Sequence, residues 1–141
     1  MTIARHALQH FYATENLPAD GNQNAWIDWV TVFDIPMPLP NIFGRVAILP
    51  YHDLHHVVTG YHTDEPGECE IGAWTLATGK GPLLGMIYDG MTTTLGLIRF
   101  RERTLRAWRR GRTCRNLYAY PLEELFEMDV EQLQELVGID A

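Results

Sequence analysis

Apolar residues repeat with helical spacing near the end of the chain. The stripe consists of Val130, Leu133, Leu136 and Val137. Residues three and four positions apart share one face of a helix, so this stripe predicts a helix with one buried side. Asp129 and Gln132 make a capping-box pattern before it, and Gly138 provides a stop after it.

The first forty residues carry a different pattern. Residues 2–13 are compatible with a short helix, whereas the run from Trp26 to Ile35 is rich in β-branched and aromatic side chains, which favour strands. The run ends in the proline-rich segment 36–40, which can continue neither a helix nor a central strand. We expect an extended strap, or one strand of a small ribbon, near residues 26–35.

Helical signals dominate after residue 40. Asn41 can cap a short helix over residues 42–49. Pro50 can then restart the chain at a favourable first-turn position, and Gly60 lies where that second helix would stop. This interpretation breaks the segment between residues 42 and 60 into two helices.

Two more helical stretches complete the chain. Pro66 opens one that runs to about Gly79, and residues 82–110 are typical of one or two further helices. The 141 residues are 46% hydrophobic and 21% charged, which is ordinary for a globular protein and enough for one core. The sequence predicts a mostly α fold, with residues 1–141 forming a single-domain helical bundle.

The segment from Gly81 to Phe100 contains one charged residue apart from Arg99, namely Asp89, and is long enough to span a bilayer. Several glycines and threonines interrupt its apolar character. The first interpretation is a buried core helix, or a helix pair that bends near Gly90. The alternatives are one wall of an apolar tunnel for a hydrocarbon ligand and, last, a transmembrane helix.

Charge is unevenly distributed along the chain. Eight arginines and one acid, Glu102, lie between Arg99 and Arg115, which gives this segment +7 and leaves −14 for the remainder of a chain whose net charge is −7. An arginine-rich segment can bind phosphates of lipids or of a diphosphate ligand, and it can equally be a solvated helix face. Nucleic acid is not an expected partner, because the acidic remainder would repel it.

Two observations bear on the compartment. The N-terminal residues lack the long apolar stretch of a secretory leader, and the two cysteines, Cys69 and Cys114, form no metal-binding or redox motif. We therefore expect a cytoplasmic protein with free thiols, which could lie peripherally on a membrane.

The segment from Tyr51 to Gly60 contains the strongest chemical signal. His52 and His56 are four positions apart, so their imidazoles share a helix face. Asp53 lies next to His52 and can bind a metal or a metal-bound water, and Glu68 follows at the start of the next helix. Two imidazoles with one or two carboxylates suit Zn²⁺, Fe²⁺ or Mn²⁺ and leave coordination positions open for catalysis.

His55 and His62 leave alternatives open. His55 can be an outer group of the site, a surface residue, or a proton shuttle near neutral pH. His62 stands where a zinc protease of the HExxHxxGxxH type has its third histidine. Asp53 is one methylene shorter than the glutamate base of such enzymes, so a zinc hydrolase is only a remote alternative.

The arrangement His52-Asp53-x-x-His56, eleven residues and then Glu68 resembles the HDxxH-x11-E motif of the coenzyme Q biosynthesis protein 4 family. Gly60 and the Gly67-Glu68 pair are similar to family positions as well. The closing segment of the family resembles Gly111 to Leu117, Glu123-Glu124 and Leu133 to Ile139. The resemblance covers roughly residues 45–139.

This resemblance implies a mostly helical protein of ubiquinone biosynthesis. It implies one divalent metal ion, zinc first and iron or manganese as alternatives, at His52, Asp53, His56 and Glu68, which would also be the catalytic residues. The implied activity is removal of the C1 carboxyl of a polyprenylated hydroxybenzoate ring, with hydroxylation there. A non-catalytic prenyl-lipid-binding scaffold is the alternative, with isoprenoid lipid, other biosynthetic enzymes, an anionic membrane surface or a second copy as partners.

Overall fold

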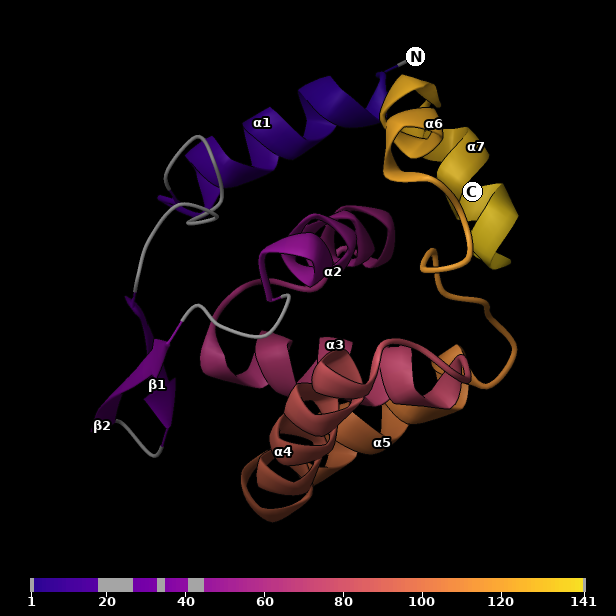
Figure 1. The fold of residues 1–141 in the computed structure, drawn as a ribbon. Coiled ribbons are helices and arrows are strands. Elements are labelled where there is room, and N and C mark those ends of the chain that lie inside the picture. Colours follow the sequence, from indigo (N-terminus) through magenta and orange to yellow (C-terminus); the bar gives the residue numbers. More distant parts are fainter. Residues whose placement is uncertain (1, 18–26, 33–34, 41–44, 141) are drawn as a thin grey trace.

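The computed structural model describes residues 2–17, 27–32, 35–40 and 45–140, and α2 lies at the centre of its helices (Figure 1). The helices are α1 (Ala4–Thr14), α2 (Arg45–Thr59), α3 (Glu65–Ala77), α4 (Leu83–Arg99), α5 (Arg101–Gly111), α6 (Leu122–Glu127) and α7 (Val130–Val137). Helices α1, α6 and α7 lie on one side of α2, and α3, α4 and α5 lie on the other (Figure 1). The expected mostly α bundle is confirmed.

One cluster of buried apolar side chains joins both sides of the bundle. Its largest fully buried members are Leu54 of α2, Ile71 and Trp74 of α3, Leu117, Leu125 of α6, and Leu133 of α7. Among the described residues, α4 contributes none of the buried members of this cluster. The core therefore centres on α2 and α3, and α4 is attached to it from outside.

The N-terminus is fixed to the junction of α6 and α7. The Ala4 N–H donates to the Met128 carbonyl at 2.7 Å, and the Val130 N–H donates to the Thr2 carbonyl at 3.0 Å. Buried Leu8 and Tyr12 then hold α1 against the core. Helix α1 is thereby positioned over α2, which carries the two motif histidines.

The expected start of α3 and both expected ends of α7 are confirmed, and α3 ends at Ala77, two residues before the expected Gly79. The Gly67 N–H donates to the Asp64 carboxylate at 2.9 Å, with Pro66 in the first turn of α3. The Asp129 N–H donates to Gln132 Oε1 at 2.9 Å, and Gly138 ends α7 with a left-handed φ of 86°.

Helix α2 is continuous through Pro50, so the expected break between two helices at this proline is wrong. Proline lacks an N–H and therefore removes one backbone hydrogen bond, but the following turns bury Leu54 and Val58 in the core. This burial holds the helix together across the lost bond. The helix stops at Gly60 as expected, where φ is 81°, and the cap expected at Asn41 lies outside the described residues.

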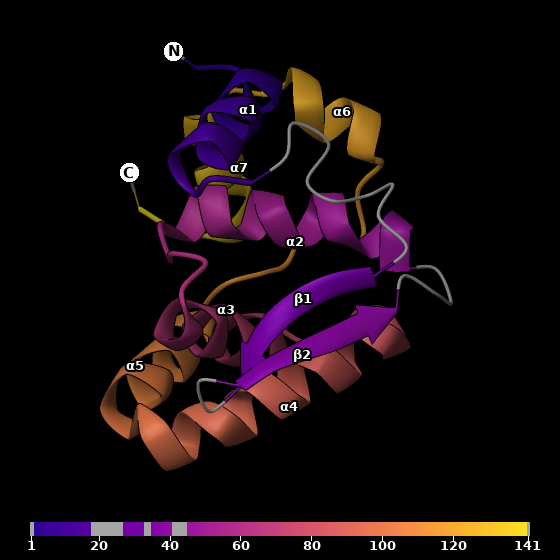
Figure 2. The same ribbon diagram turned by 90° about the vertical axis from the view of Figure 1, so that its left-hand side faces the viewer.

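The expected ribbon is a two-stranded antiparallel hairpin of β1 (Ile27–Val32) and β2 (Ile35–Pro40), visible in Figure 2. The N–H groups of a strand alternate between its two edges. Pro36, Pro38 and Pro40 occupy every second position, so the N–H groups they lack belong to one edge, and the other edge can pair with β1. Trp26 and Phe33 of the expected run lie outside the described residues.

Helix α4 is continuous through Gly90, so a division into two helices there is wrong, and the break between helices lies at Phe100 instead. Its buried face consists of Gly85, Asp89, Leu95 and Gly96. Its exposed face carries Leu83, Met86, Ile87, Met91, Leu97 and Ile98.

This orientation corrects two expectations for residues 81–100. The segment is not a buried core helix, and most of the side chains expected to wall an enclosed tunnel lie on the outer surface instead. No helix in the described part of the chain combines the length and hydropathy needed to cross a bilayer.

Candidate metal centre

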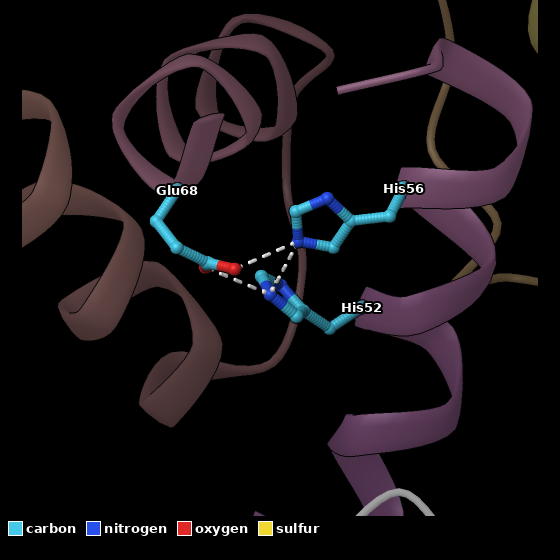
Figure 3. A group of neighbouring side chains, drawn as sticks. All are labelled: His52, His56 and Glu68. Atoms are coloured by element: carbon cyan, nitrogen blue, oxygen red, sulfur yellow. Dashed lines mark hydrogen bonds and ion pairs between the residues drawn. The ribbon is translucent and has the colours of Figure 1, made fainter. Parts of the chain in front are cut away.

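Three of the four expected ligands converge between α2 and α3 (Figure 3). His52 and His56 project from successive turns of α2, and Glu68 projects from the first turn of α3. The Nε2 atoms of His52 and His56 are 3.2 Å apart. His52 Nε2 lies 3.2 Å from Glu68 Oε2, and His56 Nε2 lies 3.1 Å from Glu68 Oε1. The ligand atoms of all three residues lie within 4.8 Å of one another.

The His56 ring is held in one orientation by its surroundings. Its Nδ1 lies 2.8 Å from the Tyr61 carbonyl oxygen, which can only accept, so Nδ1 carries the proton. Phe11 of α1 stacks on the ring, with centroids 5.5 Å apart and planes inclined by 22°. With Nδ1 bound to the Tyr61 carbonyl, Nε2 is the ring atom that faces His52 and Glu68, which is the orientation a metal-ligating histidine requires.

Electrostatics couple His52 to Glu68. Burial lowers the pKa of His52, but the Glu68 carboxylate outweighs it and raises that pKa to about 9. Burial raises the pKa of Glu68, and the charges of His56 and His52 outweigh this and hold it well below its usual range. In the metal-free protein, a protonated His52 thus neutralises Glu68, and a cation that binds here takes the place of that proton.

The donor set fits a divalent metal ion. Two imidazole nitrogens and a carboxylate converge at hydrogen-bonding distances from one another, which is the arrangement that three ligands take around one ion. The His56 side chain is fully buried, whereas those of His52 and Glu68 are 24% and 34% exposed. One side of the site is therefore accessible to a small molecule.

The structure does not bring Asp53 into this group. Neighbouring positions on a helix differ by about 100°, so Asp53 points toward α1 when His52 points toward α3. Its carboxylate accepts a hydrogen bond from the Tyr12 hydroxyl at 2.8 Å, and burial raises its pKa. Asp53 therefore links α1 to the histidine helix.

His55 is a buried structural residue, so its interpretation as a surface residue is wrong. Its Nε2 accepts the Leu117 N–H at 3.0 Å, which ties α2 to the segment before α6. Burial, reinforced by the charges of His52 and His56, lowers its pKa to about 3. A proton shuttle near neutral pH requires a pKa close to 7, so burial of His55 does not favour that role.

His62 lies away from the converging ligands. Its side chain is exposed, and its Nδ1 lies 3.0 Å from Oε1 of Glu15, the residue that follows α1. The charge-assisted hydrogen bond to Glu15 raises the pKa of His62. The third ligand of a protease-like HExxH site is therefore not supplied by His62.

Sequence reasoning gave Asp89 no role at the site. The residue is 6% exposed, and the charges that act on its carboxyl are those of His52, Glu68 and His56. Burial raises its pKa to about 7. The available signal was its position as the one acid within the apolar segment 81–100.

A scan against models of protein families gave no match, and neither did a search of curated proteins.

Proposed function

We propose that this chain is a metal-dependent enzyme that removes the carboxyl group of an aromatic acid. The observation that carries the proposal is the convergence of His52, His56 and Glu68 within 4.8 Å at a partly open site. Zinc is the first candidate for the ion, and iron or manganese are the alternatives. When bound, the ion would act as a Lewis acid toward a substrate carboxylate or phenolate, or activate oxygen if it is iron.

The residues of the chain have distinct roles in this proposal. His52, His56 and Glu68 hold the ion, and the Tyr61 carbonyl and the Phe11 ring keep His56 aligned. Asp53 and Tyr12 fix α1 beside the site. Buried His56 closes the inner side, so the substrate approaches past the part-exposed His52 and Glu68.

The substrate class follows from the resemblance of the motif to the ubiquinone-biosynthesis family. We propose a polyprenylated hydroxybenzoate-type ring whose C1 carboxyl leaves as carbon dioxide, which makes the enzyme a carbon–carbon lyase. Hydroxylation at C1 would need oxygen as the oxidant: the ring acid, O₂ and water would give the phenol, carbon dioxide and hydrogen peroxide, and this variant of the reaction would require iron or manganese because zinc has no redox chemistry. The spacing of His52, His56 and Glu68 in the sequence and their convergence in space support this assignment together.

A second candidate function is a non-catalytic scaffold on a lipid surface, in which the ion only fixes α2 to α3. The apolar outer face of α4 favours it, because exposed apolar surface of this extent marks an interaction site. The arginines of α5 would then contact lipid phosphates, and other biosynthetic enzymes or a second copy could assemble there.

Two measurements separate these functions. Elemental analysis of protein purified without added metal should find one ion per chain, and mass spectrometry should identify any lipid that co-purifies. Incubation with a prenylated hydroxybenzoate and oxygen should then release carbon dioxide, and Glu68→Gln should abolish the release. Stoichiometric metal and bound prenyl lipid without turnover would support the scaffold, and absence of metal would refute both.

A further inference from the structure

Helix α4 buries a face that contains two glycines, Leu95 and the acid Asp89, and exposes most of its large apolar side chains. Asp89 lies in the middle of the buried face, between Gly85 and Gly96, and is 6% exposed. Its carboxylate has no hydrogen-bond partner among the described residues of the chain. Burial of an unpaired carboxylate is costly, so a group that compensates its charge is expected nearby.

The helix contacts place Asp89 beside the metal centre. Gly85, one turn before Asp89, lies against Ile48, and Ile48 is one turn before His52 on α2. On the other side, Gly72 lies against the Asp89 carbonyl, and Gly72 is one turn after Glu68 on α3. Asp89 therefore lies where α4 meets both ligand-bearing helices, and Figures 1 and 2 show α4 crossing α3.

The charge balance of the metal site suggests a role for the Asp89 carboxylate. Two neutral imidazoles and the Glu68 carboxylate leave a divalent ion with one uncompensated positive charge. Burial raises the pKa of Asp89, the charges of His52 and His56 act to lower it, and the Glu68 carboxylate acts to raise it. A cation placed between His52, His56 and Glu68 would act in the same direction as the two histidines and more strongly.

We propose that Asp89 is a positioning residue that balances the charge of the metal centre in place of Asp53; its carboxylate lies outside the group of converging ligand atoms, so it acts through its charge and not as a ligand. This inference rests on the proposed function, since both concern the same metal ion. Asp89 supplies the negative charge that makes a site of two histidines and Glu68 neutral around a divalent cation. Asp53, which the motif offers for this purpose, is bound to Tyr12 on the opposite side of α2.

The test compares the same substitution at two buried aspartates. Zn²⁺ and Co²⁺ affinities are measured by chelator competition for wild type, Asp89→Asn and Asp53→Asn. We expect Asp89→Asn to weaken binding by about 10- to 100-fold, the usual effect of losing a carboxylate that supports a metal site. Asp53→Asn should weaken it several-fold less. Asp89→Glu, which keeps the charge, should bind more tightly than Asp89→Asn.

The stability of the metal-free proteins provides a second readout. Asp89→Asn should unfold at the same or a higher urea concentration than wild type without metal, yet gain less from added Zn²⁺. A purely structural Asp89 would instead lower the metal-free midpoint and leave the affinity unchanged, which would overturn the inference. If the folded wild-type protein binds no metal, the proposed function itself fails. If wild type binds metal and Asp89→Asn binds it with the same affinity, only the inference about Asp89 fails.

Discussion

Hydrogen bonds at the level of single residues determine what each histidine of α2 can do. His56 gives its Nδ1 proton to the Tyr61 carbonyl and presents Nε2 to the site. His55 gives its Nε2 lone pair to the Leu117 N–H and faces the core. Adjacent residues of the same type therefore have opposite roles, because only His56 faces Glu68, whereas the His55 ring lies against Trp74 and Tyr118.

The first prediction concerns the ligand set. His52→Ala, His56→Ala and Glu68→Ala should each abolish tight Zn²⁺ binding, because each removes one of three converging donor atoms. His62→Ala serves as the control and should bind as wild type does, since His62 is paired with Glu15 away from the site. Isothermal titration measures all four. Weakened binding in the His62 variant with an unaffected Glu68 variant would support a protease-like site instead.

The second prediction concerns pH. The raised pKa of His52, about 9, means that its protonated form stabilises the metal-free fold fully below pH 6.5 and loses this effect as the pH rises through 9. A bound ion must displace the same proton, so the apparent affinity should rise with pH by up to about tenfold per unit between pH 6.5 and 9.

Chelator competition at several pH values checks this, with thermal unfolding of metal-free and metal-loaded protein in parallel. The stabilisation by metal should grow with pH. An affinity that does not change between pH 6.5 and 8.5 would contradict the assigned role of His52.

At the scale of whole elements, glycines set how closely α3, α4 and α5 approach. A Cβ at Gly111 of α5 would collide with the Trp74 carbonyl of α3, and one at Gly96 of α4 would collide with Thr104 of α5. These contacts attach α4 and α5 to α3 through backbone proximity. The outer face of α4 then remains free to carry large apolar side chains.

The third prediction tests this close approach. Gly111→Ala should lower the free energy of unfolding by about 1–3 kcal/mol, because the backbone of α3 cannot yield as a flexible side chain would. Gly90→Ala on α4 is the matched control: no atom lies within 4 Å of its added Cβ, so it should stabilise by about 0.5–1 kcal/mol through helix propensity. Urea denaturation measures both, and equal effects would refute the packing argument.

At the scale of the molecule, the apolar face of α4 adjoins the arginine-rich helix α5. Leu83 is 75% exposed and Ile98 is 69% exposed, and Trp108 of α5 is partly exposed as well. Arg99 and Arg103 pair with Glu65 and Glu70 of α3, which anchors one side of the arginine segment. Apolar and basic surfaces side by side match an anionic membrane, which presents both hydrocarbon and phosphate.

The fourth prediction follows from this surface. Binding to vesicles of phosphatidylcholine with phosphatidylglycerol should exceed binding to phosphatidylcholine alone and should fall as salt rises, because exposed charges are screened within about 8 Å at physiological ionic strength. The double substitution Ile87→Gln and Met91→Gln should weaken it, since both side chains are exposed on α4. Co-sedimentation measures this, and a variant that binds as wild type does would exclude the α4 face.

The sequence by itself determined the features that depend on neighbours within one or two turns. The start of α3 follows from Pro66, and both ends of α7 follow from Asp129, Gln132 and Gly138, because helix-end signals depend on residues close in the chain. The His52–His56 pair follows from helical spacing for the same reason. The sequence motif also predicted Glu68 as a ligand, since one short turn brings the start of α3 back to α2.

Only the tertiary structure decided which side of each helix faces inward. Asp53 and its partner Tyr12 are 41 positions apart in sequence, so no local pattern could show that Asp53 turns away from the other ligands. The apolar composition of α4 suggested burial, but its glycines pack against α3 and α5 and leave the apolar side chains outside. Asp89 acquires its place beside His52 and Glu68 through that orientation, because burial depends on contacts between distant segments rather than on the sequence of one helix.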